Sequence, residues 1–185
     1  MHIKKEYNKE KINGEVKMMH LRKSTLADRE SIMNIIAQAQ AYFKAQGIDQ
    51  WQNNYPNLEV IQNDIRNGNS YVLVKDSEVV ATAVLTFTTE ASYESVYDGQ
   101  WLSDQPYGVI HRIAVEHELK GLGLSSMVMK EMESICLAEG IHSLRVDTHE
   151  ENLSMQKLLQ KNGFIYCGHI YLTGGAKRVI FEKLL

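Results

Sequence analysis

The sequence predicts an α/β (α+β) fold in which about seven strands and four helices follow one another along the chain. Residues 71–75 and 79–88 flank a short polar turn and are typical of a β-hairpin, and residues 165–172 and 177–184 form a second such pair. Between the two pairs, residues 109–138 have the pattern of a strand, a glycine turn and an amphipathic helix. Together these three observations indicate antiparallel strands around a central strand–turn–helix unit.

The composition fits a single globular domain. Of 185 residues, 44% are hydrophobic and 23% are charged, which provides for one sizeable core. We expect the domain to span residues 18–185, because residues 1–17 are mainly Lys, Glu and Asn and are typical of a mobile extension. The net charge of −3 gives no electrostatic reason to expect a nucleic acid or an anionic membrane as partner.

Targeting and cysteine patterns point to the cytoplasm. No apolar run is long enough to cross a bilayer, and the N-terminus lacks the apolar core of a secretory signal. Cys136 and Cys167 have neither CxxC nor metal-ligand spacing. We therefore expect two core thiols and no metal site.

The first third of the chain predicts one strand and two helices. Residues 19–23 suit a strand, and Thr25 with Asp28 resembles a capping box that opens a long amphipathic helix. A shorter helix is expected over residues 58–65, closed by Gly68. Both helices have apolar faces that should pack on the sheet.

Two loops carry aromatic residues that suit a binding site. Trp51 and Tyr55 lie among amide side chains before Pro56, and such rings can wall a substrate pocket. Alternatively, Trp51 closes the edge of the domain. The polar segment 90–104 carries Trp101, and we expect it to be a loop that borders an acceptor site or a subunit contact.

The glycine turn indicates an anion site. Gly121 and Gly123 permit a tight turn after the strand 109–115, and an amphipathic helix follows. The first N–H groups of a helix are unpaired and favour phosphate or pyrophosphate, to which Ser125 and Ser126 add hydroxyl donors. The alternative is a turn that only joins a strand to a helix.

The last third predicts a strand over residues 143–148 and a short helix over residues 152–161. Asn152 is the expected N-cap, and Gly163 stands at the C-terminal stop. The two final strands follow, joined by the turn 173–176.

The order of elements and two motifs resemble the GNAT superfamily of N-acetyltransferases from about residue 19 to the C-terminus. The segment KGLGLS is similar to the family's Q/R-x-x-G-x-G/A loop: Gly123 fills the obligatory glycine, and Lys120 and Ser125 are mild replacements. The later block 146–164 is similar to the family's strand, Asn-bearing loop and helix ending in K-x-G-F. In that block the matching residues are Lys161, Gly163 and Phe164.

The resemblance implies a mixed, mostly antiparallel sheet, splayed between its fourth and fifth strands, with acetyl-CoA in the gap. The backbone of residues 113–115 would bond the pantetheine arm like an added strand, and the N–H groups of residues 120–126 would hold the pyrophosphate. Lys120 would pair with a phosphate, and Asn152 would contact the cofactor. The implied cofactor-binding residues are Ile113, Ala114, Val115, Lys120, Gly121, Leu122, Gly123, Leu124, Ser125, Ser126 and Asn152.

Acetyl transfer to an amine needs a group that accepts the amine proton. His111 is the first candidate, because an imidazole titrates near neutral pH and its strand borders the implied reaction centre; a structural role within the sheet is the alternative. Glu116, Asp147 and His149 at expected strand ends are further candidates, although Asp147 and His149 equally suit orienting a cationic substrate or shaping the loop. Strand alternation places His111 and Ile113 on one face of the sheet.

The usual proton donor for the thiolate is missing. Many relatives place a Tyr four residues before the Gly of K-x-G-F, where this chain has Leu159. Water or another group must then supply the proton, and Tyr166 and Tyr171 are candidates by residue type alone.

The sequence therefore predicts an acetyl-CoA-dependent N-acetyltransferase that acts by direct transfer on a primary amine of a small molecule, peptide or protein. The acidic balance mildly favours a cationic acceptor, and strand edges with the 90–104 loop are compatible with a homodimer.

Two other functions stay open at this point. A dinucleotide-dependent oxidoreductase is one, because Gly121, Gly123 and Ser126 approximate G-x-G-x-x-G and Asp147 ends the next strand. A catalytically silent acyl-CoA sensor is the other, because Leu159 replaces the usual Tyr.

Overall fold

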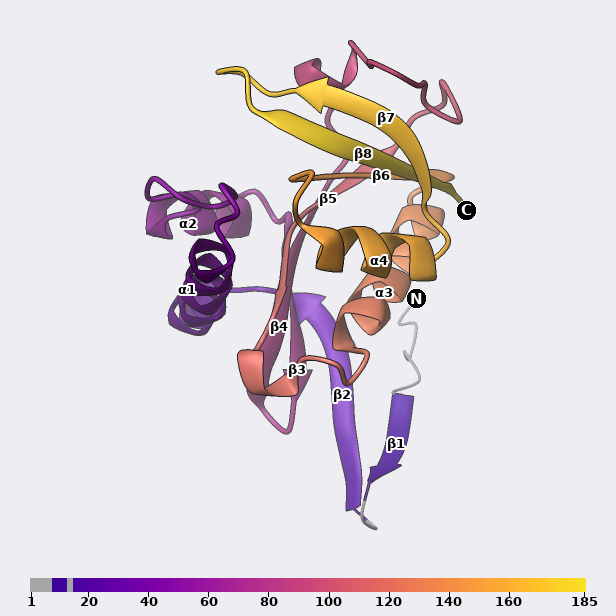
Figure 1. Ribbon diagram of the computed structural model, residues 1–185. Coiled ribbons are helices and arrows are strands. Elements are labelled where there is room, and N and C mark those ends of the chain that lie inside the picture. Colours follow the sequence, from indigo (N-terminus) through magenta and orange to yellow (C-terminus); the bar gives the residue numbers. More distant parts are fainter. Residues whose placement is uncertain (1–7, 13–14) are drawn as a thin grey trace.

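The computed structural model describes residues 8–12 and 15–185, with side chains from Met19 onward. In this part of the chain, one eight-stranded sheet lies between two pairs of helices (Figure 1). The strands are β1 (Asn8–Ile12), β2 (Glu15–Lys23), β3 (Ser70–Lys75), β4 (Glu78–Thr86), β5 (Gly108–Val115), β6 (Ser143–Thr148), β7 (Ile165–Tyr171) and β8 (Lys177–Leu184). The helices are α1 (Arg29–Ala45), α2 (Leu58–Arg66), α3 (Leu124–Ala138) and α4 (Leu153–Lys161), none of them long and apolar enough to cross a membrane.

The seven strands and four helices predicted from the sequence are confirmed as β2 to β8 and α1 to α4. Within the predicted extension, residues 1–7 and 13–14 lie outside the described residues. Its residues 8–12 form β1, which pairs antiparallel with β2. The mobility of the extension stays a prediction.

The sheet opens between β5 and β6. Its order is β1-β2-β3-β4-β5-β6-β8-β7, and among these strands β5 and β6 form the one parallel pair. Only Gly108 with Leu144 and Val109 with Arg145 are in register; beyond them the two strands diverge. These are the fourth and fifth predicted strands, so the splay implied by the family resemblance is confirmed.

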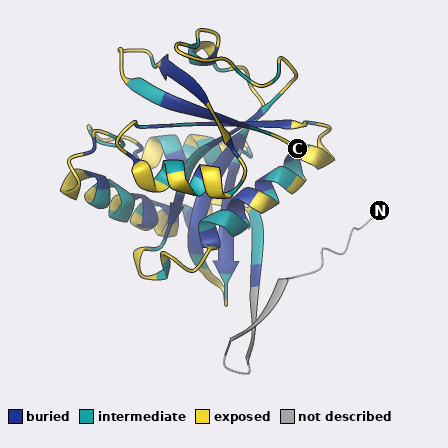
Figure 2. Ribbon diagram, turned by 45° about the vertical axis from the view of Figure 1, so that its right-hand side comes forward, coloured by how far each residue is buried: buried dark blue, intermediate teal, exposed yellow. Residues whose placement is uncertain are grey.

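Helices cover both faces of the sheet. One apolar cluster, which includes Met129, Met132 and Leu144, packs the sheet against α3 and α4. A second, which includes Ile32 and Ile36, packs it against α1 and α2. Figure 2 shows the strands mostly buried and the outer faces of the helices exposed. The amphipathic pattern of each helix thus accounts for its position.

A β-bulge interrupts β5 where it leaves β6. His111 pairs with Val84 and Ala114 pairs with Thr82, so β5 carries one more residue than β4 between these two pairs. The extra residue falls at Arg112, whose φ is 49°. Since the two β4 partners are two residues apart, His111 and Ala114 lie on the same face of the sheet.

The bulge corrects the prediction that His111 and Ile113 share a face. Ala114 packs in the cluster under α1 and α2, whereas Ile113 packs against the cluster under α3 and α4. Simple alternation fails because one residue is inserted between His111 and Ile113.

The loop between β4 and β5 folds back onto the outer edge of β7. Tyr97 and His169 exchange two backbone hydrogen bonds of 2.9 and 3.0 Å. Glycines permit this approach: a Cβ at Gly99 would lie 2.3 Å from the carbonyl oxygen of Cys167, and one at Gly168 would lie 2.5 Å from that of Tyr97. A side chain at either glycine would push the loop off the strand.

The predicted capping box before α1 is confirmed and has an additional partner. The Asp28 carboxylate accepts hydrogen bonds from the Thr25 N–H, at 2.7 Å, and from two nitrogens of Arg22, at 2.8 and 2.7 Å. Hydrogen bonding to the Arg22 guanidinium is the largest cause that lowers the pKa of Asp28 to about 2. The ionised carboxylate ties β2 to the start of α1.

Asp28→Asn is expected to lower the free energy of unfolding by about 2 kcal/mol at neutral pH. The pKa of Asp28 is lower in the folded than in the unfolded state, so its stabilisation is present above about pH 4 and is lost as the pH falls toward 2. Urea unfolding at pH 7 and near pH 3 measures this. Glu30→Gln, which removes an exposed carboxylate from the same helix, is the control; a loss in Asp28→Asn that does not shrink in acid contradicts the assignment.

Candidate active site

A cavity of about 320 Å³ lies where β5 and β6 diverge. Five regions that are far apart in the sequence build it: the end of α1 with the α1–α2 connection, the end of β4 with the loop after it, the bulged part of β5, the end of β6 with the start of α4, and the β7–β8 turn with the start of β8. Its polar and charged lining comprises Gln50, Tyr55, Thr86, Glu90, Ser92, Tyr93, His111, Arg112, Asp147, Thr148, Asn152 and Arg178. Its apolar lining comprises Phe43, Trp51, Ile110, Ile113, Val146, Met155 and Leu172.

Two of the four predicted catalytic residues, His111 and Asp147, line this cavity. Glu116 and His149 are not among its lining residues. The Glu116 carboxylate instead accepts the N–H of His117 at 3.1 Å, and Nδ1 of His149 accepts the N–H of Glu151 at 3.2 Å. Both side chains are used in shaping their own turns.

His111 contacts a carboxylate that the sequence did not mark. Its Nε2 lies 3.3 Å from Oε1 of Glu90, which belongs to the loop after β4. Hydrogen bonding to His111 lowers the pKa of Glu90, against the opposing effect of burial. Glu90 is therefore an ionised carboxylate beside the imidazole. No local pattern marks it, since it is one of several acidic residues in a polar loop.

Asp147 is held by a tyrosine that also went unpredicted. The buried hydroxyl of Tyr93 donates to Oδ1 of Asp147 at 2.8 Å. Burial is the largest cause that raises the pKa of Tyr93 well above its usual value, and the Asp147 charge adds to it. Tyr93 thus remains a protonated donor to the carboxylate.

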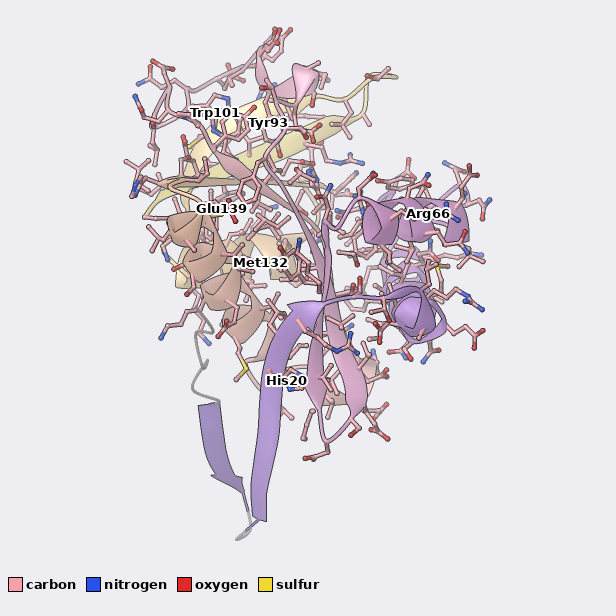
Figure 3. All side chains as sticks on the ribbon, turned by 180° about the vertical axis from the view of Figure 1, so that it is seen from behind. His20, Arg66, Tyr93, Trp101, Met132 and Glu139 are labelled. Carbon is pink, nitrogen blue, oxygen red and sulfur yellow. The ribbon has the colours of Figure 1, made fainter. Side chains whose placement is uncertain are left out.

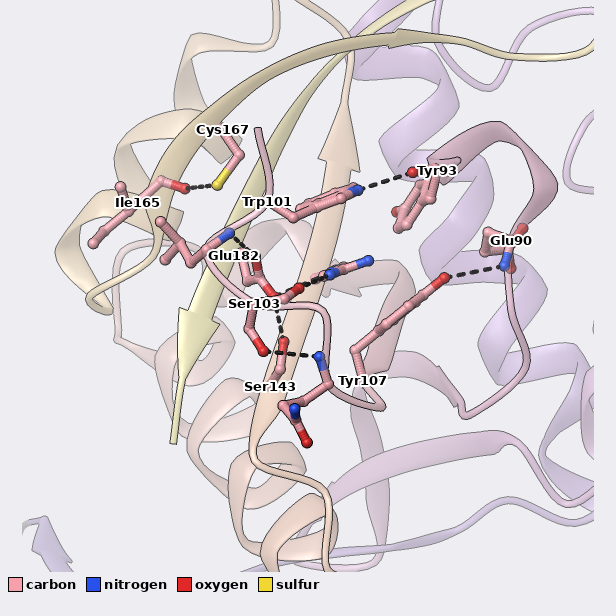
Figure 4. A network of polar contacts seen from close by, with 12 residues as sticks. Glu90, Tyr93, Trp101, Ser103, Tyr107, Ser143, Ile165, Cys167 and Glu182 are labelled. Atoms are coloured by element: carbon pink, nitrogen blue, oxygen red, sulfur yellow. Dashed lines mark hydrogen bonds and ion pairs between the residues drawn. The ribbon is translucent and has the colours of Figure 1, made fainter. Parts of the chain in front are cut away.

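A buried ion pair anchors the loop that carries Glu90 and Tyr93 (Figure 4). Nε of Arg145 on β6 lies 3.2 Å from Oε1 of Glu182 on β8. The Arg145 guanidinium also lies over the rings of Trp101 and Tyr107, 4.0 and 3.9 Å from their centroids.

Trp101 supports the cavity wall from behind. Figure 3 shows Trp101 and Tyr93 close together at the end of the molecule that carries β7 and β8, and their ring centroids are 5.1 Å apart. The indole Nε1 donates to the Tyr93 carbonyl at 2.9 Å. The segment 90–104 is a loop that borders the cavity through Glu90, Ser92 and Tyr93, while Trp101 holds a lining residue and does not itself line the cavity.

The aromatic residues of the α1–α2 connection both line the cavity, as predicted. The Trp51 ring packs edge-on against Phe43, at 5.5 Å between centroids, so it also closes the edge of the core. The Tyr55 hydroxyl accepts a hydrogen bond of 2.9 Å from Arg112, which is paired through two nitrogens with Asp64. Trp51 therefore lines the cavity and also closes the edge of the core, and its contact with a substrate stays a prediction.

The glycine turn has the geometry of an anion site. Gly121 and Gly123 have φ values of 84° and 81°, and no atom lies within 4 Å of where their Cβ atoms would be. Gly123 immediately precedes α3, whose first N–H groups have no helical acceptor. Lys120 lies beside the turn with Nζ 4.3 Å from the centroid of the Tyr42 ring, and burial lowers the pKa of its ammonium.

Asn152 is the N-cap of α4, as predicted. Its side-chain oxygen accepts from Met155 N–H and Ser154 Oγ, and its nitrogen donates to Gln50 Oε1 and Thr148 Oγ1, at distances of 2.9 to 3.2 Å. Both hydrogens and both lone pairs of the amide are engaged. A contact from this side chain to a cofactor would need one of these bonds to break.

Comparison with known proteins assigns the chain to a family. Residues 34–164, more than half of the chain, match the model of the acetyltransferase (GNAT) family. The chain belongs to the GNAT family. Its members are acetyltransferases, so this chain is an acyltransferase.

Solved GNAT structures superpose on almost the whole chain. A GNAT-family acetyltransferase from Streptococcus agalactiae 2603 is 32% identical, with a TM-score of 0.82 over 90% of this chain and 95% of that one. One from Listeria monocytogenes 4b F2365 is 19% identical, with a TM-score of 0.71 over 96% and 100%. A ribosomal-protein-alanine N-acetyltransferase from Brucella melitensis is 17% identical, with a TM-score of 0.65 over 90% and 99%, and shares the fold. No curated protein matches the chain.

Leu159 cannot replace the tyrosine that many GNAT members carry. It is fully buried in the cluster under α3 and α4. Tyr166 and Tyr171 are about half exposed and are not among the lining residues. The tyrosines that line the cavity are Tyr55 and Tyr93, and the hydroxyl of each is hydrogen-bonded to a charged neighbour.

Tyr93→Phe is expected to lower the free energy of unfolding by about 2 kcal/mol at neutral pH, because the half-buried Asp147 carboxylate loses a hydrogen-bond donor. Urea denaturation measures the loss. Tyr97→Phe removes the hydroxyl of an exposed tyrosine in the same loop and serves as the control. Equal stabilities of the two variants would show that the Tyr93–Asp147 bond contributes nothing.

Proposed function

We propose that this GNAT chain is a cytoplasmic enzyme that transfers the acetyl group of acetyl-CoA directly to a primary amine. The observation that supports it best is the His111–Glu90 pair in the cavity at the β5–β6 divergence. An amine loses a proton when it attacks as a nucleophile, and an imidazole next to a carboxylate can accept that proton. The cavity volume, about 320 Å³, favours a small acceptor or the end of a chain.

The residues around the divergence fit acetyl-CoA in two places. Beyond Val109, no described residue of β6 pairs with β5, so the backbone of residues 113–115 has an edge that an extended pantetheine arm can join. The open turn at Gly121 and Gly123 presents helix-start N–H groups to a pyrophosphate. Lys120 is close enough to that turn to add a positive charge.

The bound thioester supplies the acyl group: a C–N bond forms at its carbonyl carbon, the C–S bond breaks, and CoA leaves as a thiolate that takes a proton from water. Water is assigned this role because Leu159 is buried in the core. His111 accepts the proton lost by the amine. We assign the Nε2 hydrogen to the contact with Glu90, 3.3 Å away, which leaves Nδ1 as the nitrogen that accepts the proton.

The sheet argues against the dinucleotide alternative. A dinucleotide-binding fold is built on a mostly parallel sheet, whereas the described strands pair antiparallel except at β5 and β6. The silent-sensor alternative differs from our proposal only in turnover, and an assay of CoA release separates the two.

Acetyl-CoA at about a hundredfold excess over its Kd is expected to stabilise the protein by about 2.7 kcal/mol. Gly123→Ala should weaken acetyl-CoA binding about tenfold or more, because a Cβ in the left-handed conformation distorts the turn. Gly140→Ala is the matched control: Gly140 has φ 73°, equally open surroundings and a place at the other end of α3. Stabilisation by NAD and none by acetyl-CoA would overturn the cofactor assignment.

Glu90→Gln is expected to lower kcat/KM about tenfold or more, because the amide keeps the shape of the side chain but removes the negative charge beside the imidazole that accepts the amine proton. His111→Gln, which removes the proton acceptor itself, should lower kcat/KM at least as far, and adding Glu90→Gln to it should cost little more. Glu94→Gln, at an exposed site in the same loop, should leave kcat/KM unchanged. An equal loss from Glu90→Gln with and without His111 would mean that Glu90 does not act through His111.

A further inference from the structure

Arg178, at the start of β8, is a lining guanidinium with most of its donors unused. Its side chain is 13% exposed, and Nη1 donates to the Lys177 carbonyl at 2.8 Å. Its nearest carboxylate oxygen, Oδ2 of Asp147, is 4.0 Å from Nε, beyond hydrogen-bond range. The other N–H groups have no protein acceptor within bonding distance among the described residues.

The two other enclosed arginines near the site use more of their donors. Arg112, also in the lining, uses three nitrogens on Asp64 and Tyr55. Arg145 is paired with Glu182 and covered by aromatic rings. Of the two lining arginines, Arg178 therefore keeps more N–H groups available for a ligand.

Asp147 does not satisfy the donors of Arg178, because its Oδ2 lies 4.0 Å from Nε and its Oδ1 accepts from Tyr93. A guanidinium with free donors in a largely enclosed site binds a carboxylate through two parallel hydrogen bonds. The amine of the acceptor has a place in the same cavity, beside His111 and Glu90. One cavity thus presents a proton acceptor and an anion receptor.

We infer that the acceptor is a small amino acid: its amine faces His111, and its carboxylate binds Arg178. This inference rests on the proposed acetyl transfer. The apolar lining, which includes Trp51, Met155 and Leu172, leaves room for an apolar side chain between the two ends. A linear diamine has no carboxylate to pair with Arg178, so its use as acceptor is the outcome that distinguishes the two substrate classes.

The wild-type enzyme tests the inference without any variant. Release of CoA is measured with acetyl-CoA and the standard L-amino acids, their C-terminal carboxamides, or short linear diamines. We expect kcat/KM for the best amino acid to exceed that for its carboxamide by about 10- to 100-fold, the usual effect of one charged hydrogen-bonded contact. Equal use of acid and carboxamide, a preference for diamines, or no turnover of any amino acid overturns the inference.

Variants of Arg178 test whether this side chain causes the preference for an amino acid over its carboxamide. Arg178→Gln should remove the preference for the acid while changing kcat/KM for the carboxamide less than about threefold, and Arg178→Lys should restore part of it. If Arg178 had only a structural role, its replacement would lower kcat/KM for the acid and for the carboxamide by the same factor. Lys177→Gln removes a neighbouring cation, one that is paired with Glu150 outside the cavity, and should keep the preference.

The two proposals fail in different ways. Absence of both stabilisation by acetyl-CoA and CoA release with every amine would overturn acetyl transfer itself. Stabilisation by acetyl-CoA, with turnover of amines that lack a carboxylate, would leave acetyl transfer intact and overturn only the role of Arg178.

Discussion

The ion pair of Arg145 and Glu182 is the interaction on which the shape of the site depends. Taking two charges out of water costs several kcal/mol per ion, so such a pair persists only where every donor and acceptor is used. Here Glu182 also accepts from Ser143 and from the backbone of Leu102, and Arg145 is covered by Trp101. Two of these contacts, at Leu102 and Trp101, hold one loop to the sheet, and that loop delivers Glu90 and Tyr93 to the cavity.

The divergence of β5 and β6 and the bulge at Arg112 have separate roles in the site. The divergence leaves a backbone edge and a cavity at the centre of the sheet. The bulge turns His111 to the face on which Ala114 packs while Ile113 stays on the other. A ligand arm along the edge and an acceptor beside His111 can therefore approach the same point from different directions.

Most of the fold could be predicted because its signals are local: apolar periodicity, the Asn152 cap and the glycine at each turn need only neighbouring residues. His111 and Trp51 could be placed in one site through the order of elements. Glu90 and Tyr93 could not, because their positions depend on contacts with Arg145, about fifty residues away in the sequence. The bulge could not either, since an arginine with positive φ leaves no mark in a strand-like segment.

The backbone pairing of Tyr97 with His169 has a consequence for assembly. β7 is the last strand of the sheet, and an open edge there would invite another molecule to continue the ladder. The loop already pairs with that edge at His169, and Gly99 and Gly168 bring it so close that no further backbone fits between them at this point. A second copy that extended the sheet here would have to peel away the loop that holds Trp101. Copies of the chain therefore cannot pair along this edge while the cavity wall stays intact.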